Sequence, residues 1–161
     1  MERQSRVSEF LVLVVVLLGI WVLPLASVVT SDLQHFDFLL PVWAIAIGAA
    51  VFLLSLALRW QAQTALGRQW SFTIETAEEH ALVTRDIYAR LRHPIDASLV
   101  LWALAQPLLL QSAAAGFGGA VAVGLIWFVR VPREEAMMLE RFGDEYRAYM
   151  ARTGRLIPRR Q

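Results

Sequence analysis

Three long stretches of this sequence contain no charged residue, and they limit what the chain can fold into more than any other feature. They cover residues 10–31, 38–58 and 97–129. A helix needs about 20 apolar residues to cross the hydrocarbon core of a bilayer, so each of the first two stretches is long enough for one crossing. The third stretch would be about 50 Å long as a single helix, which exceeds a hydrocarbon core of about 30 Å. We therefore expect it to turn back near residues 111–116.

These stretches predict an all-α integral membrane protein with four transmembrane helices. The expected spans are about residues 10–31, 38–58, 97–111 and 115–131, with the third and fourth forming a helical hairpin, and residues 1–161 make up a single membrane domain. The first stretch is longer than the apolar region of a signal peptide, and no clear small-residue cleavage site follows it, which favours a membrane span. A hydrophobic share of 57% agrees with this fold class.

The charged residues predict the orientation of the chain. All 15 basic side chains are arginines, and four spans with both termini in the cytoplasm place every one of them on the cytoplasmic side. The all-arginine composition favours a GC-rich bacterial host, and we therefore expect the bacterial inner membrane. A net charge of +1 gives no reason to expect a nucleic-acid partner. Because the chain has no cysteine, it has no disulfide, thiolate metal site or cysteine nucleophile, and we expect no metal.

Two cytoplasmic segments, 59–96 and 130–158, carry most of the charges. Within the second, apolar residues recur at spacings of three and four from Arg133 to Arg152, which predicts an amphipathic helix. On this pattern alone, packing or membrane adhesion is a commoner role for such a helix than catalysis. Trp60 and Trp70 are interpreted as membrane-interface anchors, and His35 as a solvated loop residue.

Two short polar runs in these segments do not fit a purely structural role. The first runs from His80-Ala81-Leu82-Val83-Thr84 through Tyr88 to Arg92-His93-Pro94, and the second contains Arg130, Glu134-Glu135, Phe142-Gly143 and Tyr146. Imidazoles, carboxylates and an arginine at helix ends near lipid are costly unless they pair with each other or with a ligand. Taken alone, the two glutamates have an ordinary explanation, because acidic residues are favoured in the first turn of a helix, here after Pro132. Together, the runs predict a polar ligand site.

The ordered set of motifs resembles the isoprenylcysteine carboxyl methyltransferase and phospholipid methyltransferase group of integral membrane enzymes. The resemblance covers roughly residues 59–158 and includes the closing run Arg155-Leu156-Ile157-Pro158. It implies transfer of a methyl group from S-adenosylmethionine to a lipophilic acceptor at the cytoplasmic membrane face. The residues that it implies for cofactor binding are His80, Leu82, Val83, Tyr88, His93, Pro94 and Glu134.

The resemblance also implies an acceptor site. Arg130 is the residue expected at the acceptor, where a cation would orient an anionic group such as a prenylcysteine carboxylate. Glu135 becomes more important if the acceptor is an amine, and we take Arg130 and Glu135 as the candidate catalytic residues. The expected partners are a lipophilic or prenylated substrate and the lipid bilayer.

Several functions remain open at this point. Carboxyl methylation of isoprenylcysteine or a smaller analogue is the first expectation, and amine methylation of a phospholipid is the alternative within the same enzyme class. A lipophilic thiol or phenol acceptor is also compatible with the motifs. A non-enzymatic membrane scaffold with a degenerate cofactor pocket is the alternative from a different class.

Three residues depart from the family pattern. Asp86 lies where a Gly-Pro-Tyr run is usual, and Asp96 replaces an aromatic residue that lines the cofactor. Asp96 is expected to cap the N-terminus of the third span. Pro132 is expected to kink the chain between Arg130 and Glu134, so that the two need not share a helical face.

Overall fold

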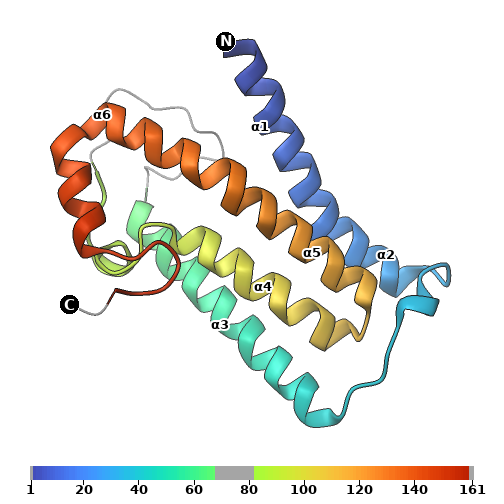
Figure 1. Cartoon of the computed structure of the whole chain (residues 1–161). Coiled ribbons are helices and arrows are strands. Elements are labelled where there is room, and N and C mark those ends of the chain that lie inside the picture. The colour runs from blue at the N-terminus through green and yellow to red at the C-terminus, as the bar shows by residue number, and fades with distance from the viewer. Residues whose placement is uncertain (1, 68–81, 160–161) are drawn as a thin grey trace.

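The computed structural model describes residues 2–67 and 82–159, and every regular element in these two ranges is a helix or a helical turn (Figure 1). In chain order they are α1 (Glu2–Leu17), the π-helical turn η1 (Leu18–Val22), α2 (Leu23–Val29), the 3₁₀ turn η2 (Gln34–Phe36), α3 (Val42–Leu66), the 3₁₀ turn η4 (Asp86–Ala89), α4 (Pro94–Leu110), α5 (Ala113–Leu125), the π-helical turn η5 (Ile126–Arg130) and α6 (Val131–Arg152). The predicted all-α class is confirmed for the described residues.

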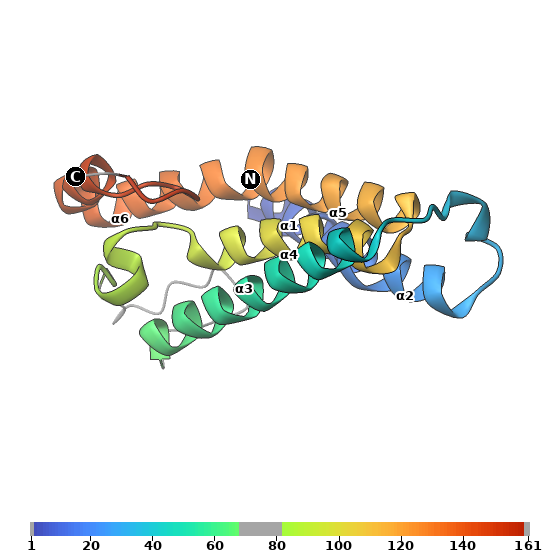
Figure 2. The same ribbon diagram turned by 90° about the horizontal axis from the view of Figure 1, so that it is seen from below.

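The long helices pack against their neighbours in a simple order. Helix α3 packs against α4, α4 against α5, and α5 against α1 and α2 (Figures 1 and 2). Small residues allow close approach: a Cβ at Gly19 would lie only 2.3 Å from the carbonyl oxygen of Gly118. Small residues at helix contacts are typical of membrane proteins, where backbones must approach closely to gain packing energy.

The first helical run, α1 through α2, contains a proline and a polar contact to α4. Pro24 has no N–H to donate to the carbonyl of Ile20, four residues earlier. The side chain of Gln106 in α4 supplies a donor instead, because its Nε2 lies 2.6 Å from that oxygen. The hydrogen bond is buried, and it joins the first helical run to the α4–α5 hairpin.

Helix α3 and the predicted second membrane span, residues 38–58, have different ends. The helix begins at Val42 after the extended residue Pro41 rather than at residue 38, and it continues to Leu66 rather than to residue 58. The predicted end was the first charged residue, but a charge does not interrupt main-chain hydrogen bonding. The helix ends at Gly67, whose φ of +55° is readily adopted by glycine.

The predicted hairpin between the third and fourth spans is present, with a shorter turn than expected. Only Gln111 and Ser112 separate α4 from α5, because residues 113–116 are already helical. Gln111 adopts the left-handed conformation with φ of +51°, and its Oε1 accepts a hydrogen bond from the N–H of Leu40. The turn is therefore tied to the segment that leads into α3.

Helices α5 and α6 form one long run through η5. Pro132 was expected to kink the chain, so that Arg130 and Glu134 need not share a helical face. In the structure the helix passes through Pro132, and the two side chains meet one turn apart. The π-helical turn directly before Pro132 widens the helix where the proline removes a donor. The main break comes later, at Gly143, whose φ and ψ are +52° and −121°. The amphipathic C-terminal segment is thus bent, and it brings the end of the chain back toward the start of α4 (Figure 1).

Within residues 2–67 and 82–159, three helical runs are long and apolar enough to cross a membrane: Phe10–Val29, Val42–Leu66 and Ala113–Arg152. Helix α4 is apolar but has only 17 residues. Many large apolar side chains on these helices are exposed, including Leu25, Val42 and Phe128. The chain is therefore an integral membrane protein, and a crossing by α4 remains a prediction.

Candidate active site

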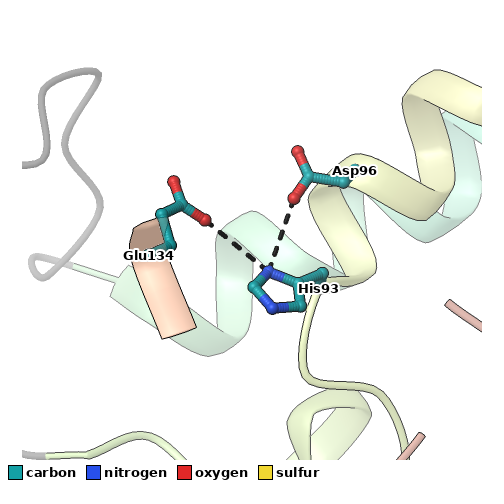
Figure 3. Close-up of side chains that lie close together, drawn as sticks. All are labelled: His93, Asp96 and Glu134. Carbon is teal, nitrogen blue, oxygen red and sulfur yellow. Dashed lines mark ion pairs between the residues drawn. The ribbon is translucent and has the colours of Figure 1, made fainter. Parts of the chain in front are cut away.

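His93 lies at the centre of a buried group of acidic side chains (Figure 3). Its Nδ1 is 3.4 Å from Oδ2 of Asp96 and 3.6 Å from Oε2 of Glu134, so two carboxylates converge on one ring nitrogen. We call His93, Asp96 and Glu134 the acidic cluster. Since Glu134 comes from α6 and His93 precedes α4, the fold brings together the two polar runs of the sequence across the α4–α5 hairpin.

Asp96 does not have the role that its position suggested. Helix α4 begins at Pro94, a residue suited to the first turn because its N–H would be unpaired there in any case. His93 therefore occupies the N-cap position, and the prediction that Asp96 caps this helix is wrong. The Asp96 side chain is 8% exposed and faces His93.

Glu135 is held by two arginines. Its Oε1 accepts hydrogen bonds from Nε of Arg92 and Nε of Arg155, each at 3.1 Å, and its Oε2 accepts one from Nη2 of Arg155. Arg92 also donates from Nη1 to the carbonyls of Met150 and Thr153. Such contacts offset the desolvation of a carboxylate that is almost fully buried. Glu135 thereby joins α6 to the loop before α4 and to the end of the chain.

The segment 153–159, which we call the C-terminal strap, lies beside residues 90–93. Gly154 accepts a hydrogen bond from the N–H of Arg92 at 2.8 Å and donates to the carbonyl of Arg90 at 3.1 Å. The N–H of His93 donates to the carbonyl of Arg155 at 3.1 Å. These main-chain bonds hold the backbone of His93 and of the residues before it.

Arg130 forms the edge of the site on the α6 side. Its Nε donates to Oε1 of Glu134 at 2.8 Å, and its side chain is 28% exposed. The two oxygens of Glu134 therefore face different groups, Oε1 toward Arg130 and Oε2 toward His93. This divides the site into a buried part around His93 and a more accessible part around Arg130.

The protonation of His93 follows from its surroundings. Burial alone would lower its pKa, because burial disfavours the imidazolium. The carboxylates of Asp96, Glu134 and Glu135 outweigh burial and raise the pKa to about 10. His93 therefore carries a positive charge at neutral pH. In the part of the chain that the structure describes, its Nε2 nevertheless has no hydrogen-bond partner, although Oε1 of Glu135 lies 3.4 Å away.

The other residues expected at the cofactor lie around the loop that leads to His93. Tyr88 is buried against Ala62 and Ala65 of α3, and Val83 packs against the same group. Pro94 is buried as the first residue of α4, and Leu82 is half-buried. His80 lies outside the described residues.

Arg59 was not assigned to the site from the sequence. In α3, Ser55 donates from Oγ to the carbonyl of Ser98 in α4 at 2.8 Å. Because the two helices run antiparallel (Figure 1), Arg59, one turn further along α3, lies beside the start of α4 and within electrostatic range of Asp96 and Arg130. An arginine within an apolar helix indicates a charged partner or a ligand. Arg59 was not recognised in this way from the sequence, because the predicted span ended at residue 58.

The donor atoms of the acidic cluster are close enough to share one cation. One atom each from His93, Asp96 and Glu134 lie within 4.8 Å of one another. Imidazole nitrogen and carboxylate oxygen are ligands for divalent metals, and carboxylates also accept hydrogen bonds from an ammonium group.

Comparison with known families and structures bears on what this site does. The model of the isoprenylcysteine carboxyl methyltransferase (ICMT) family matches residues 46–140, more than half of the chain, including the acidic cluster and Arg130. The chain belongs to this family. The match to the ICMT family covers α4 and α5 in full and the parts of α3 and α6 that flank the site.

Curated relatives carry the same family name. Protein-S-isoprenylcysteine O-methyltransferase B of Arabidopsis thaliana is 28% identical over 118 residues, which is 72% of this chain and 60% of the relative. The Schizosaccharomyces pombe enzyme is 30% identical over 103 residues (63% and 44%), and the Homo sapiens enzyme is 26% identical over 118 residues (72% and 42%). The chain thus spans between 42% and 60% of the length of these relatives.

A solved structure shares the fold. The eukaryotic intramembrane Ras methyltransferase ICMT matches 90% of this chain and 51% of its own, with a TM-score of 0.67 and 25% sequence identity. This likeness supports the membrane-embedded helical architecture described above.

Proposed function

We propose that the chain transfers a methyl group from S-adenosylmethionine to the carboxylate of isoprenylcysteine or a similar small lipophilic acceptor. The observation that carries this proposal is the convergence of His93 and Glu134 beside Arg130, in a chain of the ICMT family. This convergence supports the proposal, because groups suited to a zwitterionic ligand lie next to a cation suited to an anionic acceptor.

The residues of the acidic cluster fit the methionine part of S-adenosylmethionine. Its ammonium group needs hydrogen-bond acceptors, which Asp96 and Glu134 offer, and its carboxylate needs donors. The buried Nε2 of His93, which has no hydrogen-bond partner in the described chain, is such a donor. When bound, S-adenosylmethionine supplies a methyl group already activated on a sulfonium. The chain then has to bind and orient the reactants and exclude water rather than supply a strong base.

Arg130 would bind the acceptor carboxylate. Its partial exposure leaves it accessible from outside the acidic cluster, and its ion pair with Glu134 fixes it next to that cluster. Arginine is suited to carboxylates because its planar guanidinium offers paired N–H donors. The contacts of Glu135 favour a positioning role, in which it holds α6 against the loop that carries His93, over direct contact with an amine acceptor.

The membrane placement is part of the proposal. The four crossings would be the α1–α2 run, α3, α4 and the α5–η5 run, with the shorter α4 enclosed by its neighbours. The arginines at the site end of the helices would face the cytoplasm, because positive charge collects on that side. Arg59, Arg92 and Arg130 would then lie at the level where a lipid-borne carboxylate meets the aqueous phase.

The test is a methyl-transfer assay with the purified protein in detergent. S-adenosylmethionine with a tritiated methyl group is incubated with N-acetyl-S-farnesylcysteine, and base-labile volatile label is the expected product of ester formation. The methyl ester of the same acceptor is the matched control and should take up no label. Base-stable label on phosphatidylethanolamine would instead show an amine methyltransferase. Absence of label, together with no heat of binding for S-adenosylhomocysteine, would show a scaffold.

A further inference from the structure

Asp96 is the carboxylate of the site with the fewest charged partners. Glu135 is paired with Arg92 and Arg155, and Glu134 with Arg130 and His93. Within the described residues, Asp96 has His93 as its sole ion-pair partner. Arg59 is within electrostatic range but forms no ion pair with Asp96 among the described residues, so a carboxylate with 8% of its side chain exposed has one shared direct partner to offset its loss of hydration.

His93 cannot satisfy the carboxylates around it. Its Nδ1 has one hydrogen to share between Asp96 at 3.4 Å and Glu134 at 3.6 Å, and both distances exceed the usual N–H···O range. Its Nε2 is buried without a hydrogen-bond partner in the described part of the chain, and the side chain is 8% exposed. The acidic cluster thus has more accepting oxygens than donors, and a buried ring that lacks good hydrogen bonds on either edge.

A primary ammonium group would supply the hydrogen-bond donors that the carboxylate oxygens of the acidic cluster lack. An ammonium has three N–H donors and can bond two oxygens that lie within 4.8 Å of each other, as those of Asp96 and Glu134 do. We propose that Asp96, together with Glu134, binds the α-ammonium group of the methyl donor, and that Asp96 makes this chain selective for donors that carry that group. This inference rests on the proposed function. A metal at the same atoms is the alternative that the measurements below distinguish.

The experiment compares two ligands and matched variants of the full chain. The ligands are S-adenosylhomocysteine and its des-amino analogue, which keeps the adenosine, the thioether and the carboxylate but lacks the ammonium. Kd values are measured in detergent by calorimetry, with competition against labelled S-adenosylhomocysteine for weak binding. Asp96→Asn removes the charge, and Asp86→Asn is the control, because Asp86 is exposed and asparagine tolerates its φ of +54°.

For Asp96→Asn we expect Kd for S-adenosylhomocysteine to rise about tenfold or more, while Kd for the des-amino analogue stays within about twofold. Asp86→Asn should change neither value. Unchanged binding of S-adenosylhomocysteine to Asp96→Asn, or an equal loss for both ligands, would overturn the inference. Asp96→Ser serves as a second variant if Asp96→Asn does not fold.

Three further measurements distinguish an ammonium of the methyl donor from a different ligand at Asp96. No binding of S-adenosylhomocysteine by the unmodified chain would contradict the proposed function rather than the role of Asp96. Thermal stabilisation of the unmodified chain by ZnCl₂ that is lost in Asp96→Asn would show a metal site in place of the ammonium site. Vesicles with phosphatidylethanolamine that compete with S-adenosylhomocysteine only when Asp96 is intact would show that the ammonium belongs to an acceptor.

Discussion

The guanidinium of Arg92 and the carboxylate of Glu135 form an ion pair in which both side chains are more than nine-tenths buried, at 8% and 5% exposure. The pair joins the loop before α4 to α6, and these two elements carry the two halves of the site. Each charge offsets part of the desolvation of the other, together with Arg155 at Glu135 and the carbonyls that Arg92 contacts. The relative position of His93 and Glu134 therefore depends on a contact between their sequence neighbours.

Removal of one partner should destabilise the whole domain. Glu135→Gln leaves Arg92 buried and weakly paired, and we expect the free energy of unfolding to fall by about 3 kcal/mol. The measurement is the apparent Tm in detergent at a fixed scan rate. Asp144→Asn is the matched control, because the Asp144–Arg147 pair is exposed and should contribute less than about 1 kcal/mol. Equal changes in the two variants would contradict the structural role of Glu135.

Glu134 and Arg130 should have separable effects on binding. Glu134→Gln removes the charge that faces His93, so Kd for S-adenosylhomocysteine should rise about tenfold. Arg130→Ala should leave that Kd within about threefold and lower kcat/KM for the acceptor by about a hundredfold. Calorimetry and the methyl-transfer assay measure the two quantities. An equal loss of cofactor affinity in both variants would show that the two residues act as one unit.

The raised pKa of His93 predicts how stability depends on pH. Its pKa is about 10 in the folded chain against 6.5 for an ordinary histidine. Because the folded-state value is the higher one, the stabilising contribution is fully present below pH 6.5 and is lost as the pH rises toward 10. The apparent Tm should therefore fall across this interval. His93→Gln should show a flatter profile, whereas His35→Gln, in an exposed loop, should follow the unmodified chain.

The hydrogen bond from Gln106 to Ile20 predicts a coupling between two helices. Gln106→Leu should lower the free energy of unfolding by about 1 kcal/mol, because the carbonyl of Ile20 loses its donor. In a Pro24→Ala background, the N–H of residue 24 can donate to that carbonyl. Gln106→Leu should then lower the free energy of unfolding by less. Apparent Tm values of the unmodified chain, the two single variants and the double variant measure the coupling between positions 24 and 106. Identical losses in both backgrounds would show that the proline is not the reason for this contact.

The sequence allowed the membrane-spanning segments to be predicted because hydropathy over a long stretch depends little on tertiary contacts. The ends of the helices were harder to predict. Arg59 was taken as the end of a span, whereas helix α3 continues past it until Gly67. Only the packing of α3 against α4, with Ser55 opposite Ser98, shows that this arginine lies within electrostatic range of Asp96.

The motif residues were identified by resemblance, but their partners depend on the three-dimensional arrangement. The two arginines that hold Glu135 come from positions 92 and 155, and no local spacing indicates such a contact. The role of Asp96 was misread because an acid near a helix start usually caps it. Here Pro94 begins the helix, His93 occupies the N-cap position, and the Asp96 side chain faces His93.

The C-terminal strap is synthesised after all the described helices, and this has a consequence for biogenesis. The first five helices can enter the membrane while the ribosome is still adding the sixth, since none of their mutual contacts needs the strap. The backbone beside His93, by contrast, obtains its partners only after Gly154 and Arg155 have been made. Insertion of these helices into the bilayer and completion of the backbone contacts beside His93 are therefore separate events in time.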